Sequence, residues 1–562
     1  MEYLGLDAAP AVPHLIQLLD APDKGIRAAA ADTLGAIGKD ATAAIPKLVE
    51  RLGEGDLPRI STELPVTDVG AHAAFALGTM GKDAVAHLTP CLTNKRSAVR
   101  SNTVCALDMI GPDAHSAVTS LIGRLKDRDW LVRQCAAQAL GSIRSRPNRA
   151  IPALVESLKD KNFNVRRCAA AALGAFRPTT PTALEALSSA LHDEEGNVQH
   201  EAAEALANLG NEAVPAVPAL ADALKSREMY IQGHPGHFRP VAETAARALG
   251  AIGPPATNAM PALLDLVRDR NRTFQGFTPG DNRDNYEARG EAAIAAARID
   301  PQSDEVVRVL GQSLQFDVRI RQEVAIALAL VGPKARGTVP TLIRLSKPDR
   351  RFCHDLNCAC AAVAIEPDNP LAVRRMLDCF PPVPGPFDDD DWALLRTALA
   401  RAGAASRPAI PVLIRLVEDV LKDQENAART LATFGPEAQS AIPALLDLLT
   451  SRQEHPRQEA IEALQQIASE KSVPLLAALK DPDANVRSGV VEVLGYSPRA
   501  LPLVMKGLDD PSARVRLAAL MSLAKLESSA APAVPQIRRL LQADSRAIRE
   551  AAVIVLQKVE KR

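Results

Sequence analysis

The sequence is short of aromatic residues. Only 17 of its 562 residues are aromatic (11 Phe, 4 Tyr and 2 Trp), although 47% of the chain is apolar. Its interior must therefore be built from Ala, Leu, Val and Ile, which suit close helix–helix packing better than the wide cores of β-sandwiches or doubly wound sheets. The composition favours an all-α protein.

Cysteine, long apolar runs and net charge are also scarce. Eight Cys are too few for a disulfide-stapled secreted chain, and no run of 18 apolar residues predicts a membrane span. The first residues lack the basic and apolar regions of a secretory signal, so we expect a cytoplasmic protein. The 66 basic and 67 acidic residues give a net charge of −1, which gives no reason to expect binding to nucleic acid or an anionic membrane.

A unit of about 33 residues recurs along the chain. It reads Ile-Pro-x-Leu, then Leu-x-Asp, then Val-Arg-x-x-Ala-Ala-x-Ala-Leu-Gly, with clear copies at Ala117–Ile143, Ile151–Phe176 and Val473–Gly495. Proline suits the start of a first helix, and the apolar residues of the second half fall on one face of a 3.6-residue period. No stretch with strand periodicity interrupts the units. The sequence predicts an α-solenoid of about sixteen antiparallel helix pairs.

We expect one array over residues 1–562, in which residues 1–10 are the remnant of a preceding repeat. Four units carry extra residues between the first and the second helix. These insertions are residues 57–69, 230–240, 271–286 and 381–391. Insertions at one repeated position emerge along one edge of a solenoid, and such edges are often binding faces.

Glycines recur near the end of the second helix of many units. They are Gly35, Gly78, Gly141, Gly174, Gly250 and Gly495. Such a glycine either allows a neighbouring helix to pack closely or helps its own helix to stop. The sequence leaves both roles open.

The repeated Val-Arg signature, at Val132-Arg133 and Val165-Arg166 for example, resembles the HEAT repeat family in the short Ala-rich form of phycobilin lyases. The resemblance implies a superhelix with first helices on the convex side and second helices on the concave side. It also implies that the Arg meets an Asp at the turn between the helices. Each Asp/Arg pair six residues apart is expected to belong to a structural ladder rather than to a ligand site. The pairs are Asp127/Arg133, Asp160/Arg166, Asp481/Arg487 and Asp510/Arg516.

The best candidate site lies in two consecutive insertions, residues 230–240 and 271–286, which hold five of the 17 aromatic residues. Exposed aromatic and Arg side chains are over-represented in binding hot spots. The candidate partner-binding residues are Tyr230, His234, His237, Phe238, Arg239, Arg272, Phe274, Phe277, Arg283 and Tyr286. The alternative is that these aromatic residues fold back and pack on their own loops.

No catalytic motif stands out among the repeats, so we expect neither an enzyme nor a cofactor. His234-x-x-His237 has metal-like spacing without a third ligand nearby in sequence, and Cys358 and Cys360 replace Ala residues of a second helix, so we expect no metal site. Deoxyhypusine hydroxylase resembles this architecture but needs four His-Glu pairs, whereas this chain has one, His200-Glu201.

The sequence therefore predicts a non-catalytic scaffold that binds a protein partner through the concave face and the edge with the inserted loops. Two alternatives stay open. One is a HEAT-like lyase or another modification-enzyme subunit. The other is a nucleic-acid-binding array that uses the Arg/aromatic segment 268–286, which nearby Asp residues and the neutral net charge disfavour.

Overall fold

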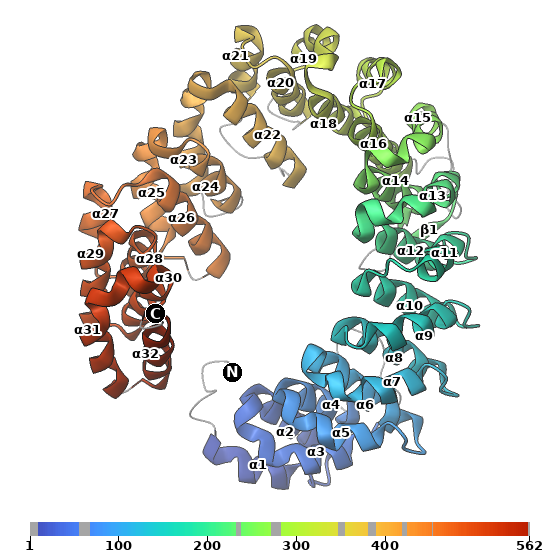
Figure 1. Ribbon diagram of the computed structural model, residues 1–562, viewed down its shortest axis with the longest axis vertical. Helices are drawn as coiled ribbons and strands as arrows, with labels where there is room; N and C mark the ends of the chain where they lie inside the picture. Colours follow the sequence, from blue (N-terminus) through green and yellow to red (C-terminus); the bar gives the residue numbers. More distant parts are fainter. Residues whose placement is uncertain are drawn as a thin grey trace. The chain divides into compact units, whose positions relative to one another are not determined.

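The computed structural model describes residues 9–55, 68–231, 238–270, 283–346, 354–379, 389–418, 424–451, 453–543 and 545–559. Contacts between Cα atoms divide the chain into two compact units, Met1–Leu330 and Val331–Arg562. Each unit is an α-solenoid in which first and second helices alternate along the chain (Figure 1). Over the described ranges the elements form sixteen helix pairs, nine beginning in the first unit and seven in the second.

The first helices are mostly short. They are α1 (Val12–Leu18), α3 (Ile45–Arg51), α5 (Val85–Cys91), α7 (Val118–Arg124), α9 (Pro147–Ser157), α11 (Pro181–Ala190), α13 (Val217–Ala223), α15 (Met260–Arg268), α17 (Asp304–Phe316), α19 (Val339–Leu345), α21 (Pro370–Cys379), α23 (Ile410–Glu418), α25 (Ile442–Leu448), α27 (Val473–Ala478), α29 (Leu501–Lys506) and α31 (Val534–Arg539). Most have proline at the first or second position, where its missing N–H breaks no hydrogen bond.

The second helices are longer. They are α2 (Lys24–Ile37), α4 (Val69–Met80), α6 (Ser97–Ile110), α8 (Trp130–Ile143), α10 (Phe163–Phe176), α12 (Gly196–Leu209), α14 (Val241–Ile252), α16 (Arg283–Ile299), α18 (Arg321–Val331), α20 (His354–Ile365), α22 (Asp389–Ala402), α24 (Gln424–Ala432), α26 (Glu454–Ile467), α28 (Ala484–Leu494), α30 (Ala513–Leu526) and α32 (Arg546–Val559). Several begin behind an Asp or Asn cap, such as Asp129, whose carboxylate accepts the N–H of Leu131 at 3.0 Å. From α2 to α16 each second helix packs against the next.

Close helix packing and helix termination, the two roles that the sequence left open, are performed by different glycines. A Cβ atom at Gly141 would lie 2.9 Å from the Cα of Ala172, and one at Gly250 would lie 3.1 Å from the Cα of Ala295. These glycines therefore allow neighbouring second helices to pack closely. The helix is ended by another glycine a few residues later. An example is Gly38 at φ +66°, a backbone conformation that residues with a side chain rarely adopt.

The core explains how the chain folds with few aromatic residues. Ala and Leu dominate the buried positions of the second helices, for example Ala136, Ala139 and Leu140 in α8. Small side chains let successive helices approach closely, so thin layers exclude water without large rings.

One β-hairpin interrupts the helices of the first unit. Strands β1 (Met229–Ile231) and β2 (Phe238–Pro240) pair antiparallel between α13 and α14, with Tyr230 opposite Arg239. The sequence shows no strand periodicity here, because three-residue strands are too short to show a period of two. The hairpin contacts α12 through β1, and α14 and α16 through β2.

Candidate functional site

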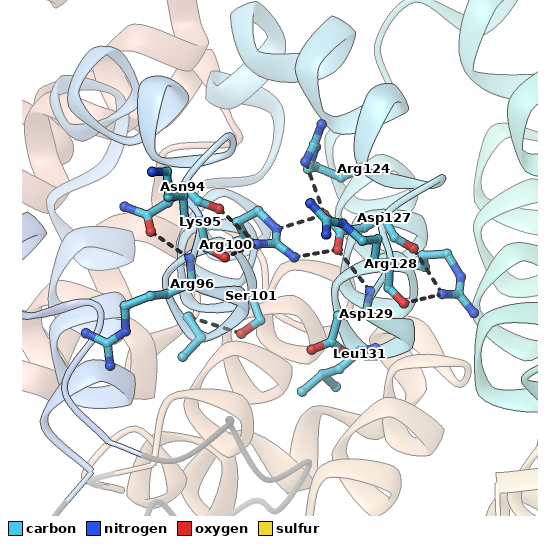
Figure 2. Close-up of polar contacts among 12 residues, drawn as sticks. Asn94, Lys95, Arg96, Arg100, Ser101, Arg124, Asp127, Arg128, Asp129 and Leu131 are labelled. Carbon is cyan, nitrogen blue, oxygen red and sulfur yellow. Dashed lines mark hydrogen bonds and ion pairs between the residues drawn. The ribbon is translucent and has the colours of Figure 1, made fainter.

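An arginine at each regular turn links one repeat to the next. Figure 2 shows Arg100 of α6 between its own turn and the following one. Its Nη1 donates to the carbonyl oxygens of Asn94 and Lys95 at 2.8 and 3.1 Å, and its Nε and Nη2 donate to the carboxylate of Asp127 at 2.8 and 2.6 Å. Burial of that carboxyl opposes ionisation, but Arg100 and the N–H of Asp129 hold the pKa of Asp127 below its usual range.

The same geometry recurs at the predicted ladder residues. Arg133 donates to the carboxylate of Asp160 at 2.6 and 2.8 Å and to the carbonyl of Asp127 at 3.0 Å. Arg166 binds Asp193 at 2.7 and 2.8 Å and the carbonyl of Asp160 at 2.9 Å. Each Arg therefore meets only the backbone of the Asp six residues before it, and its carboxylate partner lies in the next repeat. The pairing read from the sequence is corrected in this respect.

The second unit repeats this arrangement near its end. Arg487 donates to both carboxylate oxygens of Asp510 at 2.9 Å and to the carbonyl of Asp481 at 2.8 Å. Arg516 donates to the carbonyl of Asp510 at 2.7 Å. The four predicted Asp residues thus lie at the turns, and the four predicted Arg residues lie in the first turn of the following second helix and donate to backbone carbonyls of those turns.

The ladder changes at the hairpin. At the Arg position of α12 stands Gln199, which donates to the carbonyl of Asp193 at 2.5 Å and accepts the hydroxyl of Ser226 at 3.0 Å. In α14 the same position, eight residues before the closely packed glycine, is Ala242. The charged link resumes at Arg289 of α16, which binds Asp317 at 2.6 Å. Two successive helices therefore lack the guanidinium–carboxylate link.

Tyr230 of the hairpin packs inward. Tyr230 is 1% exposed, and its ring stacks on that of His200 in α12 with centroids 3.7 Å apart. Gly196 makes room, because a Cβ atom there would lie 2.2 Å from the carbonyl oxygen of Met229. Tyr230 is therefore not an exposed contact, which corrects its assignment as a partner-binding residue and agrees with the packing alternative.

Burial sets the protonation of this stack. Burial, together with the positive charges of Arg247 and Arg167, lowers the pKa of His200 to about 4, so the ring is neutral at neutral pH. Its Nδ1 lies 2.9 Å from the hydroxyl of Thr244. Burial also raises the pKa of Tyr230. The stack is an uncharged contact between the hairpin and two second helices.

A charged group lies near this stack on α12, β2, α14 and α16; we call it the Glu243 cluster, and it comprises Glu204, Arg239, Glu243, Arg247 and Glu287. Arg239 binds Glu243 at 2.7 Å and Glu287 at 3.4 Å, and Arg247 binds Glu204 at 2.9 Å. Glu243 is 3% exposed, and burial raises its pKa. Within the described ranges its Oε2 has no hydrogen-bond partner. The two arginines are each about one third exposed, so the cluster reaches the surface.

Sequence reasoning found Arg239 but missed the rest of this cluster. Glu243 lies at the helix position that Gln134, Arg167 and His200 occupy in α8, α10 and α12. The available sequence signal was that this one position is polar in four successive second helices, although Ala could have been buried there. We call the solvent-exposed side of the second helices the second-helix face.

A shallow pocket opens on the second-helix face. It lies between α8 and α10, measures about 290 Å³ and is lined in part by Gln138, Ser142 and Arg167. Arg167 is also paired with Glu201 of α12 at 3.2 Å. Arg167 therefore both lines the pocket and pairs with the next second helix, α12.

The other predicted partner-binding residues fall at or beyond the edges of the described ranges. Phe238 begins β2 opposite Ile231, Arg283 begins α16, and Tyr286 is half-buried near the start of that helix. His234, His237, Arg272, Phe274 and Phe277 lie outside the described residues. Most of insertions 57–69, 271–286 and 381–391 lies outside them as well.

The basic side chains just before residue 271 already have acidic partners. Arg268 lies 3.2 Å from Asp265 and 2.8 Å from Glu305, and Arg270 lies 3.6 Å from Asp317. These contacts neutralise much of the positive charge that a phosphate backbone would need.

In the part of the chain that the structure describes, no group of three or more His, Cys, Asp or Glu side chains is arranged to hold a metal ion. Cys358 and Cys360 are buried within α20. Among the described helices, none is both long and apolar enough to cross a membrane.

A family model for HEAT repeats matches residues 2–64, 63–141, 118–195, 151–232, 410–495 and 473–557. These matches identify HEAT repeats in general, and the closer likeness to phycobilin lyases stays a prediction. No curated protein matches the chain by sequence.

Solved structures with a similar fold include yeast importin-β (Kap95p), at a TM-score of 0.53 and 13% identity over 98% of this chain and 73% of that one. Kap121p bound to Pho4p is similar at 0.51 and 14% over 99% and 67%. A further importin-β structure is similar at 0.50 and 12% over 99% and 91%. At such low identity these likenesses show the α-solenoid fold alone.

Proposed function

Because the chain belongs to the HEAT repeat family, we propose that it is a non-catalytic scaffold that binds a protein partner through its second-helix face and the adjoining edge with the inserted loops. The partner contacts the surface of α10 to α16 beside the hairpin. Kap121p, in the structures with a similar fold, is bound to Pho4p and to the C-terminus of the phosphatase Cdc14p. Those complexes support a protein segment as the kind of partner.

The observation that carries the proposal is the incomplete pairing of Glu243. A buried carboxylate is normally satisfied by hydrogen bonds, and each exception calls for an explanation. Here one oxygen of a 3% exposed side chain has no partner among the described residues, while the flanking Arg239 and Arg247 reach the surface. Arginines that are partly desolvated and held in place by carboxylates are efficient binding anchors, because little side-chain freedom is lost on contact.

The test is affinity capture with the full chain as bait, quantified by mass spectrometry. Arg247→Glu reverses an exposed anchor of the cluster and should lower the captured amount of the enriched proteins by roughly tenfold. The matched control is Arg308→Glu on the first helix α17. This change reverses the charge of an exposed ion pair, in which Arg308 lies 3.5 Å from Glu305. Circular dichroism should show that both variants keep their helices.

A second arm addresses the inserted loop of residues 271–286. Replacing Phe274 and Phe277 by Ala should also lower capture if this edge contributes to binding. Capture that is unchanged in Arg247→Glu and in the double Phe variant would contradict the proposal. Retention of the chain on oligonucleotides at low salt, lost as salt rises, would favour the nucleic-acid alternative instead.

A further inference from the structure

Two cysteines from successive repeats lie close together in the first unit. Cys105 of α6 and Cys135 of α8 have their Sγ atoms 3.8 Å apart, and both thiols are free. A disulfide bond needs about 2.05 Å between the sulfurs, so the gap to close is roughly 1.8 Å. A shift of that size is within reach of small side-chain rotations. The two helices are already held beside each other, because α6 and α8 are packed second helices.

A polar contact holds the same two helices near the thiols. Gln138 of α8 donates to the carboxylate of Asp108 of α6 at 2.8 Å. Asp108 lies three residues after Cys105, and Gln138 lies three residues after Cys135, so the contact is about one turn from the sulfurs on both helices. The contact therefore limits how far the two thiols can move apart.

The two thiols differ in access. Cys105 is partly exposed, whereas Cys135 is 9% exposed. The contact with Cys105, together with burial, raises the pKa of Cys135 well above its usual range. An oxidant from solvent therefore reaches Cys105 first, and Cys135 is placed behind it as the resolving thiol.

We propose that Cys105 and Cys135 are an oxidative modification site, at which hydrogen peroxide drives a disulfide bond between two successive repeats. The ionised sulfur of Cys105 attacks one peroxide oxygen, so that an S–O bond forms, the O–O bond breaks and hydroxide leaves, which takes the proton that the Cys105 thiol released and becomes water. The sulfur of Cys135 then attacks the Cys105 sulfenic acid, so that the S–S bond forms and the S–O bond breaks. The leaving hydroxyl takes the thiol proton of Cys135 as water. Two thiols and one peroxide give one disulfide and two waters.

The bond would join α6 to α8 covalently within the regular part of the array. Repeat arrays are held together by contacts between neighbours, so a covalent bond across one interface restrains the opening of that interface. This modification is independent of the proposed partner binding, because it lies on helices away from the Glu243 cluster.

The experiment treats the reduced full chain with hydrogen peroxide, alkylates the remaining thiols and maps the peptides by mass spectrometry. The expected product has lost two hydrogen atoms and contains a peptide pair linked through Cys105 and Cys135. Its thermal unfolding midpoint should rise, and a dithiol reductant should reverse both changes.

Serine variants provide the controls. Cys105→Ser and Cys135→Ser should each abolish the linked peptides, whereas Cys91→Ser and Cys168→Ser should leave them. Recovery of Cys105 and Cys135 as alkylated thiols would overturn the proposal, as would a sulfinic acid at Cys105 without a link or a link from Cys135 to Cys168. A yield that is unchanged in urea would overturn it too, because the selectivity must come from the folded repeats.

Discussion

The regular repeats α6 to α10 and the repeats α12 to α16 around the hairpin use the same helix packing but different links between neighbours. In the regular repeats Arg100, Arg133 and Arg166 each bind the carboxylate of the next turn. Around the hairpin that link is replaced by Gln199 with Ser226 and then by Ala242, while Tyr230 and the Glu243 cluster join the helices. The guanidinium–carboxylate link is thus absent at α12 and α14 beside the hairpin, and it is present again at Arg289 of α16. At α12 and α14 the hairpin and the Glu243 cluster therefore join neighbouring helices in place of the ladder.

The largest effect should come from breaking the ladder in the regular region. Arg133→Met removes the partner of the mostly buried Asp160 and the donor to the carbonyl of Asp127. We expect a loss of about 2–3 kcal/mol in the free energy of unfolding, because a poorly solvated carboxylate loses its counter-charge. The measurement is urea unfolding followed by circular dichroism. The control is Arg407→Met, whose pair with Glu437 is exposed, and an equal shift there would contradict the ladder's structural role.

The next prediction concerns the close packing of neighbouring second helices, which the two regions share. A methyl group at Gly141 or Gly250 would press on the backbone of the neighbouring second helix. Gly141→Ala and Gly250→Ala should each destabilise the chain by about 2 kcal/mol, since overpacking outweighs the gain in helix propensity. Gly123→Ala in α7 is the control: nothing lies within 4 Å, and a gain of about 0.5–1 kcal/mol is expected. A loss at Gly141 without one at Gly250 would mean that the two regions differ in packing as well.

A pH experiment isolates the stack that is particular to the hairpin region. The pKa of His200 is about 4 in the folded chain, below its ordinary value of 6.5, so the unfolded state binds a proton first as the pH falls. The stabilising contribution of neutral His200 is therefore present above about pH 6.5 and is lost toward pH 4. His200→Phe keeps a ring against Tyr230 but cannot be protonated. Between pH 7 and pH 5 the variant should lose about 1–2 kcal/mol less stability than the native chain. Parallel pH profiles would refute the assignment.

Much of the fold could be predicted because it is local and repeated. Proline at helix starts, the 3.6-residue period and the Asp/Arg positions all recur within single units. Which carboxylate each Arg binds could not be read, because an Asp six residues before Arg133 and one 27 residues after it recur with the same period. The sequence pattern is identical for both pairings, and only the stacking of units decides.

The candidate site was less predictable because it depends on contacts between units. The burial of Tyr230 requires Gly196, 34 residues earlier, to leave room for β1 on α12. The Glu243 cluster joins residues of three helices and of strand β2, which share a surface only after stacking. Aromatic content directed attention to residues 230–240, but there the scarce aromatic residue Tyr230 anchors the hairpin on α12.

The smallest effect would come from rebuilding the ladder where it is interrupted. Ser226 occupies the place of the ladder Asp: it lies 27 residues after Gln199, and its hydroxyl accepts the N–H of Glu228 as the carboxylate of Asp127 accepts that of Asp129. Gln199→Arg or Ser226→Asp alone adds a partly buried charge without a partner and should give no gain. The double variant should be more stable than the sum of the single changes by about 1 kcal/mol, measured as a double-mutant cycle in urea. An additive result would show that the hairpin holds this turn in a geometry that the ladder cannot use. A positive coupling, with weaker capture of the partner by the double variant, would show that the interruption serves binding rather than folding.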